Sequence, residues 1–248
     1  MDLGLSGRTA LITGASAGIG AAMAEVFAAE GCHLHLAARG KEKLDAIADR
    51  LRADHGVRID THRVDLRVHA DIERLAEVTD GPHILINNAG DIPAGSLAAV
   101  DDTAWRHGWE LKVFGYIGLT RLIYERMKER GRGVIVNDIG AAGERPDFEY
   151  IAGSTGNAAL MAFTRALGGR SWRDGIRVVG INPGPVATER ITKLIDSSAR
   201  FRAMAADFPF ARPAEPREIA YAAAFLASDR SAYTSGTILT VDGGLSAA

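Results

Sequence analysis

A glycine-rich turn near the amino terminus has the spacing of a phosphate-binding loop. Residues 13–20 read Thr-Gly-Ala-Ser-Ala-Gly-Ile-Gly, between a short apolar run and a segment with helical periodicity. Glycine permits positive φ angles and close backbone approach, and the start of the following helix offers unpaired N–H groups to an anion. We therefore expect a dinucleotide pyrophosphate here, the alternative being a tight turn without a ligand. The predicted binding residues are Gly14, Ser16, Ala17, Gly18, Ile19 and Gly20.

The end of the second apolar run bears on which dinucleotide is bound. An acidic residue there would hold the ribose hydroxyls of NAD(H), but the chain has Ala38 followed by Arg39. A guanidinium group pairs well with a 2′-phosphate. The sequence therefore favours NADP(H), with NAD(H) as the second choice. The alternative is an arginine on a solvated turn.

Strand-sized apolar runs alternate with helix-sized amphipathic segments along the whole chain. This alternation predicts an α/β fold, a Rossmann-type doubly wound parallel sheet of about seven strands with helices on both faces. We expect a single dinucleotide-binding domain over residues 1–248, with a helical segment near 190–212 covering the substrate. The expected strands are 9–13, 33–38, 57–64, 83–87, 133–137, 176–181 and 238–241, and the expected helices are 21–29, 41–52, 70–78, 102–130, 153–173 and 217–228.

Composition excludes several classes of partner. Lysine plus arginine total 29 and aspartate plus glutamate 31, a formal charge of −2, so nucleic-acid and membrane surfaces are not expected. The one cysteine, Cys32, precludes an intramolecular disulfide, and without a signal or membrane span the protein is expected in the cytoplasm. His33, His35 and His62 lie on or near strands, but we expect no metal site.

The glycine spacing, G-x-x-x-G-x-G, resembles that of the short-chain dehydrogenase/reductase family. Four further marks of the family occur in order: Asn87-Asn88-Ala89-Gly90, Asn182-Pro-Gly-Pro-Val-Ala-Thr188, Phe225-Leu-Ala-Ser228 and Val241-Asp-Gly-Gly244. The resemblance implies a small-molecule substrate and a homotetramer or homodimer joined through the two long helices and the last strand. It also implies that Asp65 contacts adenine and that Pro183, Gly184 and Thr188 border the nicotinamide amide. The cofactor residues implied in this way are Asp65, Leu66, Asn88, Ala89, Gly90, Pro183, Gly184, Val186 and Thr188.

The catalytic pattern of the family is where this chain departs. The family uses a tyrosine, a lysine four residues later, a serine and an asparagine for general acid catalysis and carbonyl polarisation. By register, Asn157 stands at the lysine position, Gly153 at the tyrosine, Gly140 at the serine and Lys112 at the asparagine. All four expected residues are replaced.

Nearby polar residues offer substitutes. Tyr150 precedes the helix and either leans into the pocket as an acid or forms its lip, the latter being favoured. We expect Lys112 to lie close to Asp138 or Asn157, because a buried unpaired charge is costly. The candidate catalytic residues are Lys112, Asp138, Tyr150 and Asn157.

Three functions remain open from the sequence. The first is an NADP(H)-preferring oxidoreductase acting on a small carbonyl or alcohol through an altered proton relay. The second is a dinucleotide-binding sensor or partner subunit without dehydrogenase chemistry, and the third is a lyase or isomerase on the same scaffold. Apolar side chains of the covering segment are expected to line the substrate pocket or to pack between helices; they are Phe201, Met204, Phe208 and Phe210.

Overall fold

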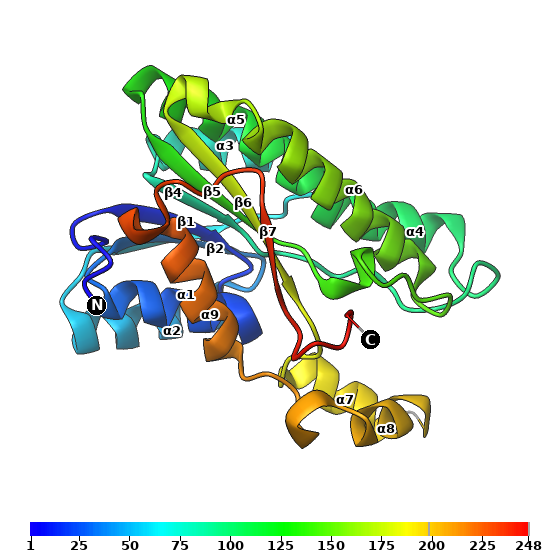
Figure 1. Ribbon diagram of the computed structural model, residues 1–248. Helices are drawn as coiled ribbons and strands as arrows, with labels where there is room; N and C mark the ends of the chain where they lie inside the picture. Colours follow the sequence, from blue (N-terminus) through cyan, green and yellow to red (C-terminus); the bar gives the residue numbers. More distant parts are fainter. Residues whose placement is uncertain (198, 248) are drawn as a thin grey trace.

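A parallel sheet runs through the molecule. The computed structural model describes residues 1–197 and 199–247, apart from the side chains of 190, 194, 197, 200 and 201. Within them, seven strands pair in the order β3-β2-β1-β4-β5-β6-β7 (Figure 1), which confirms the predicted fold class. The strands are β1 (Thr9–Thr13), β2 (His33–Ala38), β3 (Ile59–Arg63), β4 (Ile84–Asn87), β5 (Gly133–Asp138), β6 (Ile176–Pro183) and β7 (Ile238–Val241).

Helices cover both faces of the sheet, which is why the strands read as nearly continuous apolar runs. On one face, Met23, Leu44 and Ile219 of three helices join the core that contains Ile12 and Val136. These helices are α1 (Gly18–Ala29), α2 (Lys41–His55) and α9 (Pro216–Ala227). The other face is covered by α3 (His69–Val78), α5 (Gly115–Arg130) and α6 (Ile151–Gly168), with α4 (Asp102–Trp109) leading into α5.

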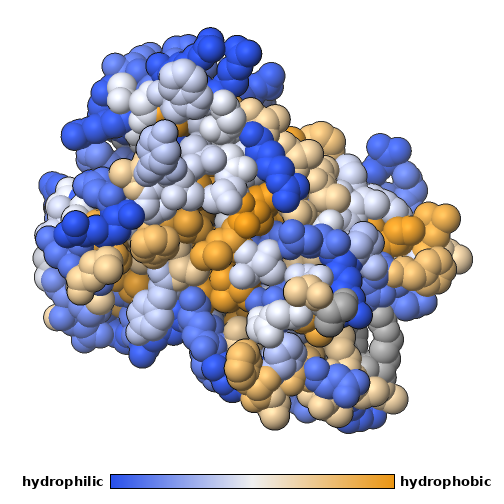
Figure 2. Space-filling model, in the orientation of Figure 1, coloured by the Kyte–Doolittle hydropathy of each residue, from blue (hydrophilic) through white to orange (hydrophobic). Residues whose placement is uncertain are grey.

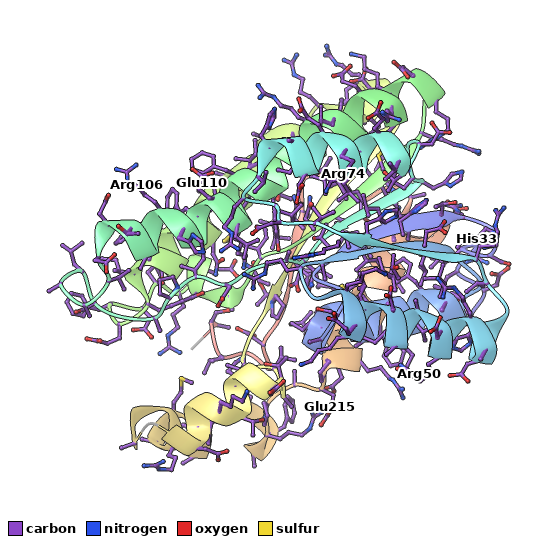
Figure 3. All side chains as sticks on the ribbon, turned by 180° about the vertical axis from the view of Figure 1, so that it is seen from behind. His33, Arg50, Arg74, Arg106, Glu110 and Glu215 are labelled. Atoms are coloured by element: carbon purple, nitrogen blue, oxygen red, sulfur yellow. The ribbon has the colours of Figure 1, made fainter. Side chains whose placement is uncertain are left out.

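Charged side chains lie on the outer surfaces of the helices. Figure 3 shows Arg50 on α2, Arg74 on α3 and Arg106 on α4 pointing away from the sheet. Each pairs with a carboxylate three or four residues away on its own helix. No described helix is long and apolar enough to cross a membrane.

Two expected helices differ from the structure in ways that matter for the site. The helix expected over 102–130 contains a π-helical turn, Glu110–Phe114, and π-turns are frequent at functional sites. The helix expected over 153–173 starts earlier, at Ile151, and ends at Gly168. A Cβ on Gly168 would lie 2.5 Å from the carbonyl oxygen of Val178, so the chain passes the sheet too closely there for any larger residue.

The segment expected to cover the substrate forms α7 (Glu189–Ser197) and α8 (Ala199–Ala206), which project beyond the sheet in Figure 1. Met204 lines the cleft described below. Phe208 is buried, whereas Phe210 is 83% exposed with a φ of 56°, so the expectation that Phe210 lines the pocket is wrong. The tight turn around Pro209 directs the Phe210 side chain outward. The side chain of Phe201 lies outside the described residues.

Two imidazoles on neighbouring strands make folding sensitive to pH. His35 Nδ1 and His62 Nε2 are 3.1 Å apart, and burial lowers the pKa of both groups from its ordinary value. In the described residues no group of three metal-ligating side chains is suited to a metal ion. Burial therefore resists protonation of the two imidazoles in the folded state, and the negative charge of Asp60 opposes this effect.

We predict that His62→Gln weakens the loss of stability on acidification. Because the folded pKa values lie below the unfolded value of about 6.5, the stabilisation is complete above that pH and is lost as the pH falls through it. Urea midpoints measured from about pH 8 to about pH 5 should fall less steeply in the variant than in the wild type. Parallel curves for the two proteins would show that the pair does not carry this dependence.

Candidate active site

A cleft of about 1760 Å³ opens along the carboxyl ends of the strands. This edge, where the strand order reverses between β1 and β4, is where open α/β sheets bind ligands. Of the predicted site residues, all of which the structure describes, Gly20, Asp65 and Gly153 are not part of the lining. The predicted residues in the lining are Gly14, Ser16, Ala17, Gly18, Ile19, Arg39, Leu66, Asn88, Ala89, Gly90, Lys112, Asp138, Gly140, Tyr150, Asn157, Pro183, Gly184, Val186 and Thr188.

The glycine turn leaves no room for side chains beneath it. Gly14 has a φ of +68°, and a Cβ there would lie 2.7 Å from Asn88 Nδ2. A Cβ on Gly20 would overlap the carbonyl oxygen of Gly14 and lie 2.5 Å from the same amide nitrogen. The backbone thus forms an open cradle at the start of α1, which fits the pyrophosphate of a dinucleotide.

Thr13 holds this turn against the end of β4, a role that the sequence analysis missed. Its hydroxyl donates to the Ile86 carbonyl oxygen at 3.3 Å and accepts from the backbone N–H groups of Asn88 and Ala89 at 3.0 and 3.2 Å. The Asn88 amide donates in return to the Thr13 carbonyl oxygen at 2.8 Å. The signal in the sequence is a hydroxyl residue directly before the first glycine.

At the expected adenine end, Arg39 and Asp65 have different surroundings. Arg39 is exposed and lines the cleft. The Asp65 carboxylate accepts from Arg67 Nε at 2.9 Å, and this hydrogen bond, together with the nearby positive charge of Arg39, lowers its pKa. Its neighbours Val64 and Leu66 face the cleft instead. Contact between Asp65 and adenine stays a prediction.

Lys112 points into the cleft from the π-helical turn. Its ammonium group donates to the carbonyl oxygen of Ile139, just after β5. Its aliphatic part packs on Gly90, where a Cβ would lie 2.9 Å from Lys112 Cδ. The glycine that ends the Asn87–Gly90 run therefore provides the space for this lysine.

Asp138 is a buried carboxyl group at the end of β5, with 6% of its surface exposed. Burial raises its pKa to about 7, and the nearby positive charge of Lys112 opposes this rise. The Tyr116 hydroxyl donates to the Asp138 backbone carbonyl at 2.9 Å and fixes the strand end. The cleft thus contains a carboxyl group that both gains and loses a proton near neutral pH.

Neighbouring side chains occupy the space beside both catalytic-position glycines. Gly140 has a φ of +130°, and a Cβ there would lie 2.8 Å from Asn157 Nδ2. A Cβ on Gly153 would overlap the hydroxyl end of the Tyr150 ring, 2.5 Å from Cε2. Tyr150 is half-buried at the start of α6, lines the cleft and packs against the apolar cluster of Ile92 and its neighbours. Its role as a lip residue stays a prediction.

The carboxyl-terminal tail also borders the cleft, which the sequence analysis did not anticipate. Arg145 Nη1 donates to the Leu245 carbonyl oxygen at 2.7 Å, and Arg145, Leu245 and Ser246 all belong to the lining. The Asp242 carboxylate accepts from the backbone N–H groups of Gly244 and Ser246 and shapes this tail. No local pattern in the sequence indicates a contact across 100 positions.

Together, the parallel sheet, the glycine cradle and the cleft at the strand ends define a dinucleotide-binding protein of the Rossmann type. The family model described as enoyl-(acyl carrier protein) reductase matches residues 14–246. The chain belongs to the short-chain dehydrogenase/reductase family of oxidoreductases.

Similar proteins cover nearly the whole chain. The galactitol 2-dehydrogenase (L-tagatose-forming) of Cereibacter sphaeroides is 36% identical over 245 residues, 97% of this chain and 95% of that protein. The L-sorbose reductase of Gluconobacter frateurii, solved with NADPH and L-sorbose, has a TM-score of 0.93 at 34% identity, covering 100% of both chains. A 7α-hydroxysteroid dehydrogenase solved with NADH and a 7-oxo bile acid has a TM-score of 0.91 at 29% identity, covering 98% of this chain and 96% of that one.

Proposed function

We propose that the chain interconverts a small carbonyl compound and its alcohol with NADP(H), through a proton relay based on Asp138 and Lys112. The observation that carries this proposal is a buried carboxyl of pKa about 7 in the same cleft as the glycine cradle. A general acid works best when its pKa lies near the operating pH. Asp138 meets that condition without the usual tyrosine and lysine.

Different residues of the chain would bind the cofactor and transfer the proton. The backbone from Gly14 to Gly20 would bind the pyrophosphate, and Arg39 would bind a 2′-phosphate. A bound nicotinamide supplies or accepts the hydride. During reduction the Asp138 carboxyl would give its proton to the carbonyl oxygen of the substrate. The carboxylate left behind is stabilised by the Lys112 charge and regains a proton from water.

Ketoses and polyols are the substrates that we would test first. The galactitol dehydrogenase and the L-sorbose reductase act on members of this class. The polar groups that line the cleft include Asp91, Asp147 and Glu149. Such groups suit a substrate with several hydroxyls. We infer that the α7–α8 segment, through Met204 and Lys193, covers it.

The proposal is tested by following the absorbance of NADPH with ketoses, simple ketones and aldehydes, and of NADP⁺ with polyols. We expect turnover with at least one carbonyl–alcohol pair. Tight NADPH binding without turnover on the whole panel would favour the sensor function, and conversion of a substrate without net NADPH consumption would favour a lyase or isomerase.

We predict that Arg39→Ala weakens NADPH binding by about 10- to 100-fold and leaves NADH binding nearly unchanged. A hydrogen bond to a charged group contributes about 1.5–3 kcal/mol, and about 1.4 kcal/mol is tenfold in affinity. Fluorescence titration of both cofactors measures the effect, with the exposed Arg50→Ala as the control. Equal weakening of NADPH and NADH would mean that Arg39 does not recognise the 2′-phosphate.

Association into a homo-oligomer remains our expectation. Figure 2 shows apolar side chains in the middle of the face that carries β7 and α9. Tyr221, Phe225 and Leu239 are 56%, 43% and 39% exposed there. Exposed apolar patches of this kind are typical of protein interfaces. We propose that a second copy of the chain covers this face.

A further inference from the structure

We infer that the side-chain amide of Asn157 is the hydrogen-bond donor that polarises the substrate carbonyl, in the space beside Gly140 where the family has a serine. This inference rests on the proposed function. The amide nitrogen, Nδ2, lies 2.8 Å from the position of a Cβ on residue 140, and Oδ1 lies 3.8 Å from it. The donor end of the amide is thus the end that takes the place of the missing side chain.

The position of Asn157 suits a ligand contact. The residue is 2% exposed, yet it is part of the cleft lining. Its Oδ1 atom has no hydrogen-bond partner among the described residues. A buried polar atom without a partner is costly, so native structures seldom retain one unless a ligand or water completes it. The hydroxyls of a ribose or of a polyol are donors that the cleft would bring to this atom.

The surrounding backbone holds the amide in place. Gly140 has a φ of +130°, a conformation that L side chains rarely adopt, and so the space above it stays open to Asn157. The preceding carbonyl, that of Ile139, accepts a hydrogen bond from Lys112. The turn that faces the amide is therefore fixed by a charged group, which favours preorganisation.

Asn157 and Asp138 have complementary chemistry. At neutral pH an amide donates a hydrogen bond without transferring its proton. In this respect it resembles a serine that polarises a carbonyl. Asparagine side chains act in this way in oxyanion holes. Asn157 would stabilise the charge that develops on the carbonyl oxygen, and Asp138 would then protonate that oxygen.

The test compares ketone binding to the enzyme–NADP⁺ complex in the wild type, Asn157→Ala and Asn157→Asp. Calorimetric titrations use L-sorbose, dihydroxyacetone and cyclohexanone as probes. Both variants should bind the ketone about tenfold more weakly, since each lacks the amide donor, and NADP⁺ affinity should change less than ketone affinity. Arg165→Ala, an exposed position on the same helix, serves as the control and should bind like the wild type.

Melting temperatures of the complexes exclude simple misfolding. Equal ketone affinity in the wild type and both variants overturns the inference, as does a loss of NADP⁺ affinity equal to the loss of ketone affinity. Absence of ketone binding by the wild-type complex overturns it too. If the wild type binds a ketone with the help of Asn157 but never oxidises NADPH, the proposed function fails and the assignment of Asn157 stands.

Discussion

Asp138→Asn should lower kcat for carbonyl reduction by about 100- to 10 000-fold, the usual range for a general acid. The amide has nearly the shape of the carboxyl group but has no proton to give to the carbonyl oxygen. In the wild type, the pKa of about 7 means that the reduction rate falls as the pH rises through neutrality. This decline should be missing from the residual activity of the variant. Steady-state rates across the pH range measure both effects.

Stability provides the control for Asp138→Asn. The folded pKa of this carboxyl is raised above the unfolded value of about 3.9, so its contribution to stability is present at low pH and is lost as the pH rises toward 7. The variant should therefore be at least as stable as the wild type at about pH 8. NADPH affinity should stay within a few-fold. If the variant folds, binds NADPH and has the kcat and pH profile of the wild type, Asp138 is not part of the proton relay.

Gly20→Ala should reduce NADPH affinity by more than about 100-fold and destabilise the protein by about 1–3 kcal/mol or more, the usual cost of overpacking. Its Cβ would overlap the Gly14 carbonyl oxygen and press on the Asn88 amide. Neither group moves easily, because Gly14 forms the cradle and the Asn88 amide is bonded to Thr13. Fluorescence titration and thermal unfolding measure the two effects.

Gly118→Ala is the matched control for this change. Gly118 also lies in a helix, but a Cβ there would meet only the Ile72 side chain, 3.4 Å from Cδ1 and 4.0 Å from Cγ2. Replacing a helical glycine by alanine then stabilises by up to about 1 kcal/mol. If Gly20→Ala bound NADPH as well as Gly118→Ala does, the turn would not be the pyrophosphate site.

The fold is predictable from this sequence because its periodicities are long and consistent. Buried runs such as Thr9–Thr13 and Ile176–Pro183 alternate with amphipathic helices, and this order permits few architectures. The helix from 102 to 130 is predictable, but its π-helical turn is not. A single π-helical turn within a longer helix leaves no distinct mark on the hydrophobic periodicity.

The candidate site is predictable only where local backbone geometry determines it. The glycine turn at the start of α1 and the place of Tyr150 before α6 follow from the order of residues along the chain. Other features of the site depend on rotamers and on tertiary packing. They are the hydrogen bond from Arg67 to Asp65, the hydrogen bond from Arg145 to Leu245 and the position of the Asn157 amide beside Gly140. A sequence pattern gives the register of Asn157, but not the direction in which its amide points.

Hydride transfer itself is tested most directly with NADPH that carries deuterium at both C4 positions of the nicotinamide, because an enzyme transfers only one of the two hydrogens. The wild-type protein is incubated with this cofactor and a ketose, and the alcohol is analysed by mass spectrometry and NMR. We predict one deuterium on the former carbonyl carbon, formed far more slowly by Asp138→Asn. An alcohol without label, or bound NADPH that never delivers its label to any carbonyl compound of the panel, would contradict the proposed function.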